Sequence, residues 1–145
     1  MLRNKVLMWN NETLLNTSVF LLRCAIGIIL FVFGAGKVFG WFGGFGMEQT
    51  IKFFNQIGIS VFLTYVSSYT EFIGGLFLTI GLLTRPAAFA VIINMLVATI
   101  VTLPGGFLGA NGAAFQFIFL IISIVILLMG PMAFSLDFLL FRQKN

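Results

Sequence analysis

The chain has 145 residues, enough for one domain, and 60% of them are hydrophobic while only 8% are charged. Soluble domains carry about 25% charged residues, and the mean hydropathy here is +1.12, so the composition predicts a protein whose solvent is lipid. The chain has no histidine and one cysteine, Cys24. This excludes histidine-ligated haem and intramolecular disulfides, and argues against a zinc site or an iron–sulfur cluster held by this chain alone.

The first predicted element is a membrane-spanning helix over residues 19–39. A bilayer core needs about 20 apolar residues in a helix, and the glycine-rich stretch GWFGGFG at 40–46 ends this apolar run. In the connection that follows, apolar residues recur at helical spacing with polar residues between them. Residues 47–58 are therefore predicted to form a short amphipathic helix along the membrane surface.

Three further apolar runs follow, over residues 62–83, 87–103 and 113–129. The sequence TRP at 84–86 is predicted to make the tight turn between the first two of these runs, and a glycine-rich connection separates the last two. Together the runs predict an all-α membrane protein: a four-transmembrane-helix bundle with a short interfacial helix in its outer loop. We expect residues 1–145 to form this single domain.

The basic residues predict the orientation in the membrane. One side of the predicted bundle carries five of them: Arg3, Lys5, Arg85, Arg142 and Lys144. The other side carries Lys52 alone. Because the side richer in lysine and arginine normally faces the cytoplasm, both termini are predicted to be cytoplasmic. The net charge of +4 is scattered along the chain and does not indicate a nucleic-acid partner.

Each predicted span has one face of small or polar residues and another of large apolar ones. On the second span this face consists of Thr64, Ser68, Glu71, Gly75 and Thr79. In lipid, helices associate through close backbone approach at small residues and through hydrogen bonds, so these faces are predicted to point inward. Cys24, on the first span, is interpreted as a small packing residue.

Glu71 is the residue that packing alone does not explain. It lies nine residues into its span, about 14 Å deep at the helical rise, where a charged carboxylate needs a partner. Lys37 is the first candidate partner and Arg23 the second, because both lie on the small face of the first span. Asn94 is expected to hydrogen-bond into the same interior, and Ser68 to connect it toward the outer side. The predicted buried polar site is thus Glu71, Lys37, Arg23, Asn94 and Ser68, with no metal.

Three stretches carry a resemblance to a known family. They are LRCAIGIILFVFGAGKVFG, YTEFIGGLFLTIGLLTRPAA and GPMAFSLDFLL, and they resemble the DoxX family of small bacterial membrane proteins over about residues 20–140. The resemblance implies a four-helix protein of the bacterial inner membrane with a loose link to redox chemistry. It also implies that Arg23, Lys37, Glu71 and Arg85 are the charged positions of the family pattern. Family members often have a histidine near the end of the third helix, where this chain reads VTLPGGF.

The sequence leaves three functions open. The first is an accessory subunit of a quinone- or thiol-linked membrane redox system, in which a protein partner would carry the electrons and a quinone would be the cofactor that the polar interior can bind. The second is a small proton-coupled transporter, which would need an oligomer. The third is a non-catalytic membrane scaffold, in which Glu71 and Lys37 fix the helix register. The expected partners are the lipid bilayer and either another protein or further copies of this chain.

Overall fold

The computed structural model describes residues 12–109 and 112–141, and these residues form helices and no strands. In chain order the elements are α2 (Glu12–Phe39), η1 (Trp41–Gly43), α3 (Gly46–Gln56), α4 (Val61–Ile80), α5 (Thr84–Thr102), η2 (Leu103–Gly105), α6 (Ala114–Met129) and α7 (Leu136–Phe141). The all-helical class predicted from the sequence is confirmed. The predicted domain also includes residues 1–11, 110–111 and 142–145, which lie outside the described part of the chain.

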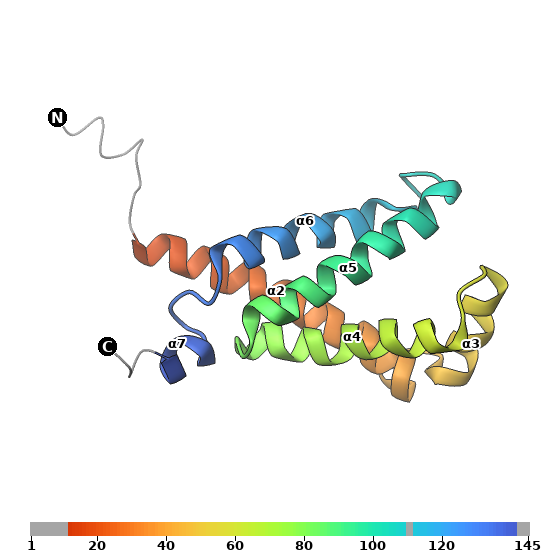
Figure 1. Ribbon diagram of the computed structural model, residues 1–145, viewed down its shortest axis with the longest axis horizontal. Helices are drawn as coiled ribbons and strands as arrows, with labels where there is room; N and C mark the ends of the chain where they lie inside the picture. The colour runs from red at the N-terminus through yellow and green to blue at the C-terminus, as the bar shows by residue number, and fades with distance from the viewer. Residues whose placement is uncertain (1–11, 110–111, 142–145) are drawn as a thin grey trace.

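The four longest of these helices pack side by side. α2 contacts α4 and α6, and α5 contacts α4 and α6, so each helix has two neighbours. Figure 1 shows α7 and the α4–α5 turn at one end of the bundle, with α3 and the α5–α6 connection at the other. By length and composition, α2, α4 and α5 extended to Gly105 are able to cross a membrane. α6 is apolar but shorter, at 16 residues.

The turn between α4 and α5 lies three residues earlier than the sequence predicted. Gly81, with φ of 72°, ends α4 in the left-handed conformation that glycine adopts without strain, and α5 already begins at Thr84. Residues 84–86 are therefore the first turn of α5 and not the connection. Pro86 fits there because its missing N–H has no helical partner at this position.

α2 begins earlier than the predicted span, at Glu12. The hydroxyls of Thr17 and Ser18 donate to the carbonyls of Thr13 and Leu14, at 2.7 and 2.8 Å, one turn before them. These bonds to the helix's own backbone let polar residues continue the helix. Hydropathy locates only the apolar part of such a helix.

α2 and α4 touch backbone to backbone. A methyl group added at Gly34 would collide with the main chain of Phe72, and one added at Gly27 would lie 2.8 Å from the carbonyl oxygen of Gly75. A side chain on Gly75 would in turn strike the main chain of Phe31. The glycines on the two helices are therefore what allow this close contact, as expected for helices that associate in lipid.

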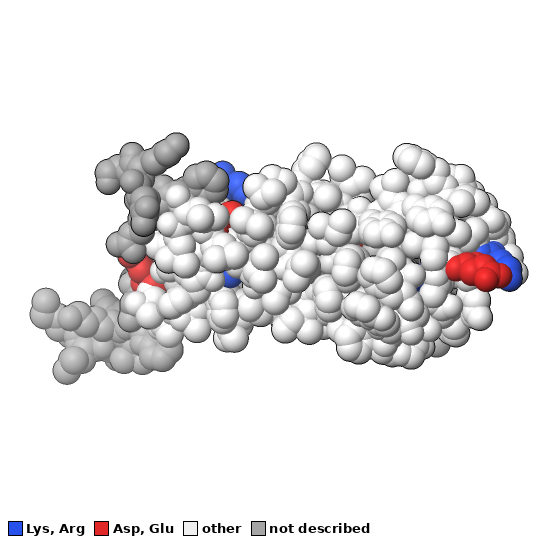
Figure 2. Space-filling model, turned by 90° about the horizontal axis from the view of Figure 1, so that it is seen from below, with Lys and Arg blue, Asp and Glu red and all other residues white. Residues whose placement is uncertain are grey.

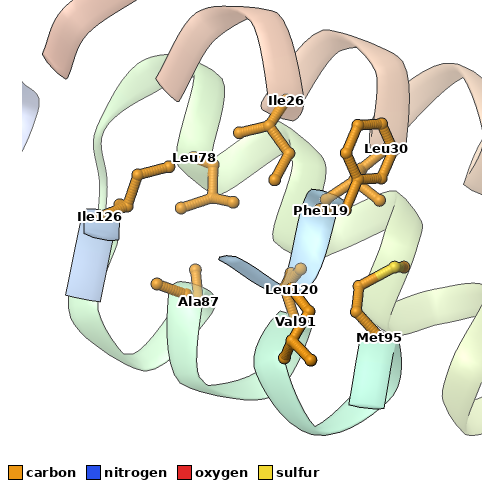
Figure 3. Packing of buried hydrophobic residues seen from close by; sticks show 10 residues of the cluster. Ile26, Leu30, Leu78, Ala87, Val91, Met95, Phe119, Leu120 and Ile126 are labelled. Atoms are coloured by element: carbon orange, nitrogen blue, oxygen red, sulfur yellow. The ribbon is translucent and has the colours of Figure 1, made fainter. Parts of the chain in front are cut away.

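Large apolar side chains fill the interior between the four helices. Figure 3 shows residues of all four converging on one cluster: Ile26, Leu30, Leu78, Ala87, Val91, Met95, Phe119, Leu120 and Ile126. Each of the four helices also carries large apolar side chains on its exposed, outer face. Helices that are apolar on their outer face are typical of a membrane bundle.

The charges on the surface gather at the two ends of the bundle. Figure 2 shows a broad, nearly uncharged belt between them. At the tip that carries α3, Lys52 donates to Glu48 at 2.7 Å, and this hydrogen bond, with the lysine charge, holds the pKa of Glu48 below its ordinary value. α3 contacts α2 and α4, and its Thr50 is buried. Three charged residues of α2 and α4, Arg23, Lys37 and Glu71, are buried or half-buried and do not form part of this charged surface.

The α2–α4 contact generates a test of the packing. Gly34→Ala is expected to lower the free energy of unfolding by about 1–3 kcal/mol, because the new methyl group meets main-chain atoms that move only with the helix. Thermal or denaturant unfolding in detergent micelles measures this loss.

Gly74→Ala is the matched control. Its methyl group would meet only the Cγ2 atom of Val91, at 3.1 Å, and that side chain is able to adjust. The substitution is expected to change stability little or to raise it slightly through helix propensity. Equal losses for Gly34→Ala and Gly74→Ala would contradict the role given to the α2–α4 backbone contact.

Candidate functional site

A lysine and a glutamate form an ion pair inside the bundle. The Lys37 ammonium lies 2.7 Å from both carboxylate oxygens of Glu71 and donates a directed hydrogen bond to Oε1. The side chain of Glu71 is 7% exposed and that of Lys37 26% exposed. The carboxylate is therefore almost completely removed from solvent, while one side of the lysine remains accessible. The pairing is the one that the sequence favoured.

The glycine contact between α2 and α4 explains why these two side chains meet. Gly34 lies against Phe72, the residue after Glu71. Lys37 follows Gly34 by three residues and so lies on the same face of α2. Because the two backbones approach closely at Gly34, Lys37 and Glu71 lie near enough for their side chains to meet. The small residues thus position the charged ones.

Two further elements contribute to the site. Asn94 of α5 donates from Nδ2 to Glu71 Oε1 at 3.3 Å. The ring of Phe54, from α3, lies 5.5 Å from the Lys37 ammonium, within the range of a cation–π contact. Four helices therefore meet at one ion pair. Asn94 lies where the sequence predicted it, whereas Phe54 was predicted only as part of the apolar face of α3.

Ser68 lies on the same face of α4 as Glu71, one turn toward α3. Its hydroxyl is fully buried and has no hydrogen-bond partner among the described residues. Glu71 Oε2 likewise faces the lysine charge without receiving a directed hydrogen bond. Thr64, one turn further on, donates to the carbonyl of Ser60 at 3.0 Å. Buried polar atoms normally have hydrogen-bond partners. The Ser68 hydroxyl and Glu71 Oε2 are therefore able to accept a further hydrogen-bonding group on this side of the site.

Arg23 does not belong to this site. The sequence offered it as a second partner for Glu71, but it precedes Lys37 by 14 residues, about 21 Å along α2. The structure instead buries it completely at the other end of the bundle, where Nη2 donates to the carbonyl oxygen of Phe134 at 2.6 Å. The Arg23 side chain therefore does not reach the protein surface. Its Nε and Nη1 have no partner among the described residues.

The segment that covers Arg23 was not found by sequence reasoning. Asp137, which is 5% exposed, accepts hydrogen bonds from the backbone N–H groups of Leu83 and Thr84 at 2.7 and 2.8 Å. It thereby caps the start of α5 from a distant part of the chain. Ser135 caps α7 by accepting from Phe138 N–H at 3.1 Å. An aspartate within the apolar run FSLDFLL was the available signal.

We refer to residues 134–137 as the C-terminal clasp. It joins α2, through Arg23, to the α4–α5 turn. The N–H of Asp137 also donates to the carbonyl oxygen of Gly81 at 2.9 Å, so the clasp binds this turn through backbone and side chain together. A side chain at Gly81 would strike both Ser135 and the Arg23 guanidinium. Gly81 is thus needed for both its left-handed φ and its lack of a side chain.

The geometry limits what the site is able to hold. Within residues 12–109 and 112–141, no three histidine, cysteine, aspartate or glutamate side chains come together as metal ligands. We refer to Lys37, Glu71, Asn94 and Phe54 as the Lys37 cluster. It offers two hydrogen-bond donors, the lysine ammonium and the Asn94 amide, beside one carboxylate. Such a set is able to bind a polar oxygen atom and to hold a proton. Cys24 packs against α4, with its sulfur 3.8 Å from the carbonyl oxygen of Thr79.

Comparisons with known proteins identify the family of this chain. The chain is 38% identical over 126 residues to a protein of Bacillus subtilis (strain 168) named "Putative oxidoreductase CatD", and the match covers 86% of this chain and 88% of that relative. No solved structure matches the chain. The family model described as DoxX matches residues 18–104, a range that contains Arg23, Lys37, Glu71, Arg85 and Asn94. The chain therefore belongs to the DoxX family.

Proposed function

We propose that this chain is an accessory subunit of a redox system in the bacterial inner membrane, to which it contributes a polar site built on Lys37 and Glu71. One observation carries the proposal: the Glu71 carboxylate is almost completely removed from solvent in the interior of an apolar bundle, where Lys37 and Asn94 bind it. Ionisable residues inside membrane helices are costly and usually functional. The relative named as an oxidoreductase supports the choice of redox chemistry.

The proposed topology has four membrane crossings with both termini in the cytoplasm. α6 supplies the fourth crossing, since its 16 residues rise about 24 Å against a bilayer core of about 30 Å. Local thinning of the bilayer accommodates such a shortfall. α3 lies at the outer interface, with Glu48 and Lys52 toward water. Of the basic residues that set this orientation, Arg3, Lys5, Arg142 and Lys144 lie outside the described residues, while Arg85 lies at the α4–α5 end.

In the proposed system a partner protein carries the electrons and this chain handles a proton. Electron transfer to a quinone or a disulfide is accompanied by proton uptake, and Glu71 is placed to hold such a proton. Lys37 fixes the position of this carboxylate by donating a hydrogen bond to Glu71 Oε1 at 2.7 Å. The Ser68 hydroxyl is buried on the same helix face and has no hydrogen-bond partner among the described residues, so it offers the next hydrogen-bonding position toward the α3 end.

A quinone is the cofactor that we propose for the site. Its carbonyl oxygens accept hydrogen bonds, and the Lys37 ammonium and Asn94 amide are the donors available. The lysine is the accessible member of the cluster, so a ring would approach past Phe54 of α3, whose face already lies against the ammonium. The quinone supplies the electron-accepting group when it is bound; the residues of this chain bind its oxygens and exclude water.

A scaffold is the second candidate. The ion pair links α2 to α4, and both of its charges are paired, which is what a device for fixing helix register requires. In this case the protein would hold a partner in place and take no part in proton transfer. The two candidates differ in what they require of Glu71: redox chemistry needs a titrating carboxylate, whereas register needs only a hydrogen-bonding group of the same shape.

The pairing of Lys37 with Glu71 is tested by a double-mutant cycle. Lys37→Met and Glu71→Leu are each expected to lower the free energy of unfolding by about 3 kcal/mol, the low end for a broken buried pair, because a quarter of Lys37 stays accessible. The double variant should recover part of this loss, since no charge is then left unpaired.

The exposed Glu48–Lys52 pair of α3 is the matched control for this cycle, since its 2.7 Å contact is as short but fully hydrated. Lys52→Met and Glu48→Leu are expected to show no measurable coupling. Strict additivity of the Lys37 and Glu71 effects would mean that the two side chains do not interact energetically.

The topology is tested by reporter fusions. A reporter active only in the cytoplasm is expected to work when it is fused at Asn145, and a periplasmic reporter when it is inserted beside Lys52. The reason is the excess of basic residues on the side of the termini. A periplasmic reporter that works at Asn145 would overturn the orientation.

The redox role is tested on complexes isolated from native membrane in mild detergent. A redox enzyme is expected to copurify with the wild-type chain, and its quinone- or thiol-dependent electron transfer is measured in the isolated complex. Glu71→Gln, which keeps the hydrogen-bonding shape but does not titrate, should leave the complex assembled and reduce its rate at least tenfold. Full activity of Glu71→Gln with intact assembly would exclude the proton role, and loss of assembly alone would favour the scaffold.

A further inference from the structure

Two surface grooves meet where α4 turns into α5. The larger has a volume of about 330 Å³ and runs along the two helices, with Tyr69, Ile73, Phe77, Pro86 and Ala90 among its lining residues. The smaller has a volume of about 180 Å³ and is lined by Leu83, Arg85, Pro86, Pro131 and Asp137. Both are lined by Leu83 and Pro86, so they adjoin. Together they form one slot, apolar along the helices and charged at the end of the bundle.

Small residues create the apolar part of this slot. Gly74 lines it, and a methyl group there would meet only one atom of Val91, at 3.1 Å. Ala87 and Ala90 of α5 also line it and add little bulk. The furrow is therefore a property of the residue types along α4 and α5. It opens on the outer face of the bundle, where Tyr69, Ile73 and Ala90 are exposed.

Arg85 supplies the charge at the end of the slot. It is exposed, and its guanidinium lies against Gly130, where an added methyl group would come within 2.9 Å of Nε. No side-chain hydrogen bond or ion pair engages Arg85 within the described part of the chain. The nearby carboxylate of Asp137 already accepts from the N–H groups of Leu83 and Thr84. The Arg85 charge is thus available for an anion, in the first turn of a helix, where the dipole also favours one.

We propose that this slot binds an anionic phospholipid, with its phosphate at Arg85 and one acyl chain along the α4–α5 furrow. The chemistry of the ligand follows from the order of the lining groups: a cation at the end of the bundle, then a furrow lined mainly by apolar residues. Arginine binds phosphate through two parallel hydrogen bonds, and basic pockets between membrane helices on the cytoplasmic side bind anionic headgroups. The site rests on the membrane topology proposed above and is separate from the Lys37–Glu71 cluster.

The test measures which lipids stay bound. The purified full chain is incorporated into nanodiscs of equal parts phosphatidylglycerol and phosphatidylcholine, released into detergent, and analysed by native mass spectrometry for retained lipid. The wild type is expected to retain phosphatidylglycerol over phosphatidylcholine by about fivefold, the factor that one basic residue near the surface contributes. Arg85→Gln should remove this preference, and Arg85→Lys should keep most of it.

Two controls separate a site from general effects. Lys52→Gln removes an exposed cation at the opposite end and should leave the preference unchanged. Ala90→Trp fills the furrow and should reduce retention of both lipids, whereas Ala25→Trp, at an exposed position on α2 outside both grooves, should not. Equal effects of Arg85→Gln and Lys52→Gln, or of Ala90→Trp and Ala25→Trp, would overturn the proposal.

Inorganic phosphate distinguishes a lipid headgroup from a free anion. Added to the lipid-bound wild type, it is expected not to displace phosphatidylglycerol at millimolar concentration, because the acyl chain holds the lipid in the furrow. Displacement by phosphate, with Ala90→Trp retaining lipid normally, would identify a free-anion site and exclude the lipid. A chain that fails to enter nanodiscs would contradict the membrane topology and this site together, whereas normal incorporation without lipid preference contradicts this site alone.

Discussion

The arrangement of this protein depends on the contact between the backbones of α2 and α4. In a hydrocarbon solvent, two apolar helices gain little by burying large side chains against each other, because lipid tails are equally apolar. Gly27, Gly34 and Gly75 let the two main chains touch. At this distance dispersion contacts between the helices stabilise the pair, and polar side chains of one helix are able to bind those of the other. The meeting of Lys37 and Glu71 follows from this approach. With larger residues at these positions, the lysine and the carboxylate would lie too far apart to neutralise each other.

The bundle has two buried polar centres of different character. At the Lys37 end a cation, a carboxylate and an amide pair with one another, while Glu71 Oε2 receives no directed hydrogen bond. At the Arg23 end a buried guanidinium has one carbonyl as its direct partner and leaves two donor atoms unpaired among the described residues. The first centre joins helices that are adjacent in sequence order, and the second joins the first helix to the end of the chain. The first is built from side chains of three helices, and the second from one side chain and the main chain.

Sequence patterns predicted the first centre well and the second poorly, for a physical reason. Helical spacing and the cost of a charge in lipid restrict Glu71 to a few side-chain partners, and the glycine spacing on α2 selects Lys37 among them. The partner of Arg23 is a main-chain oxygen 111 residues away, and no residue type marks a carbonyl as an acceptor. The α4–α5 turn was misplaced because a proline marks either a turn or a first helical turn. The deciding feature, the left-handed Gly81, becomes clear only with the clasp packed beside it.

The clasp has a consequence for the order in which the bundle assembles. Because a chain is synthesised from its N-terminus, α2, α4 and the start of α5 are made before residues 134–137. Until the clasp docks, the Arg23 guanidinium lacks the Phe134 carbonyl, and the N–H groups of Leu83 and Thr84 lack the Asp137 carboxylate. The contact of Arg23 closes a loop of 111 residues, and such long-range contacts are slow to form. Docking of the clasp is therefore a late step of folding, which completes a bundle whose helices already touch.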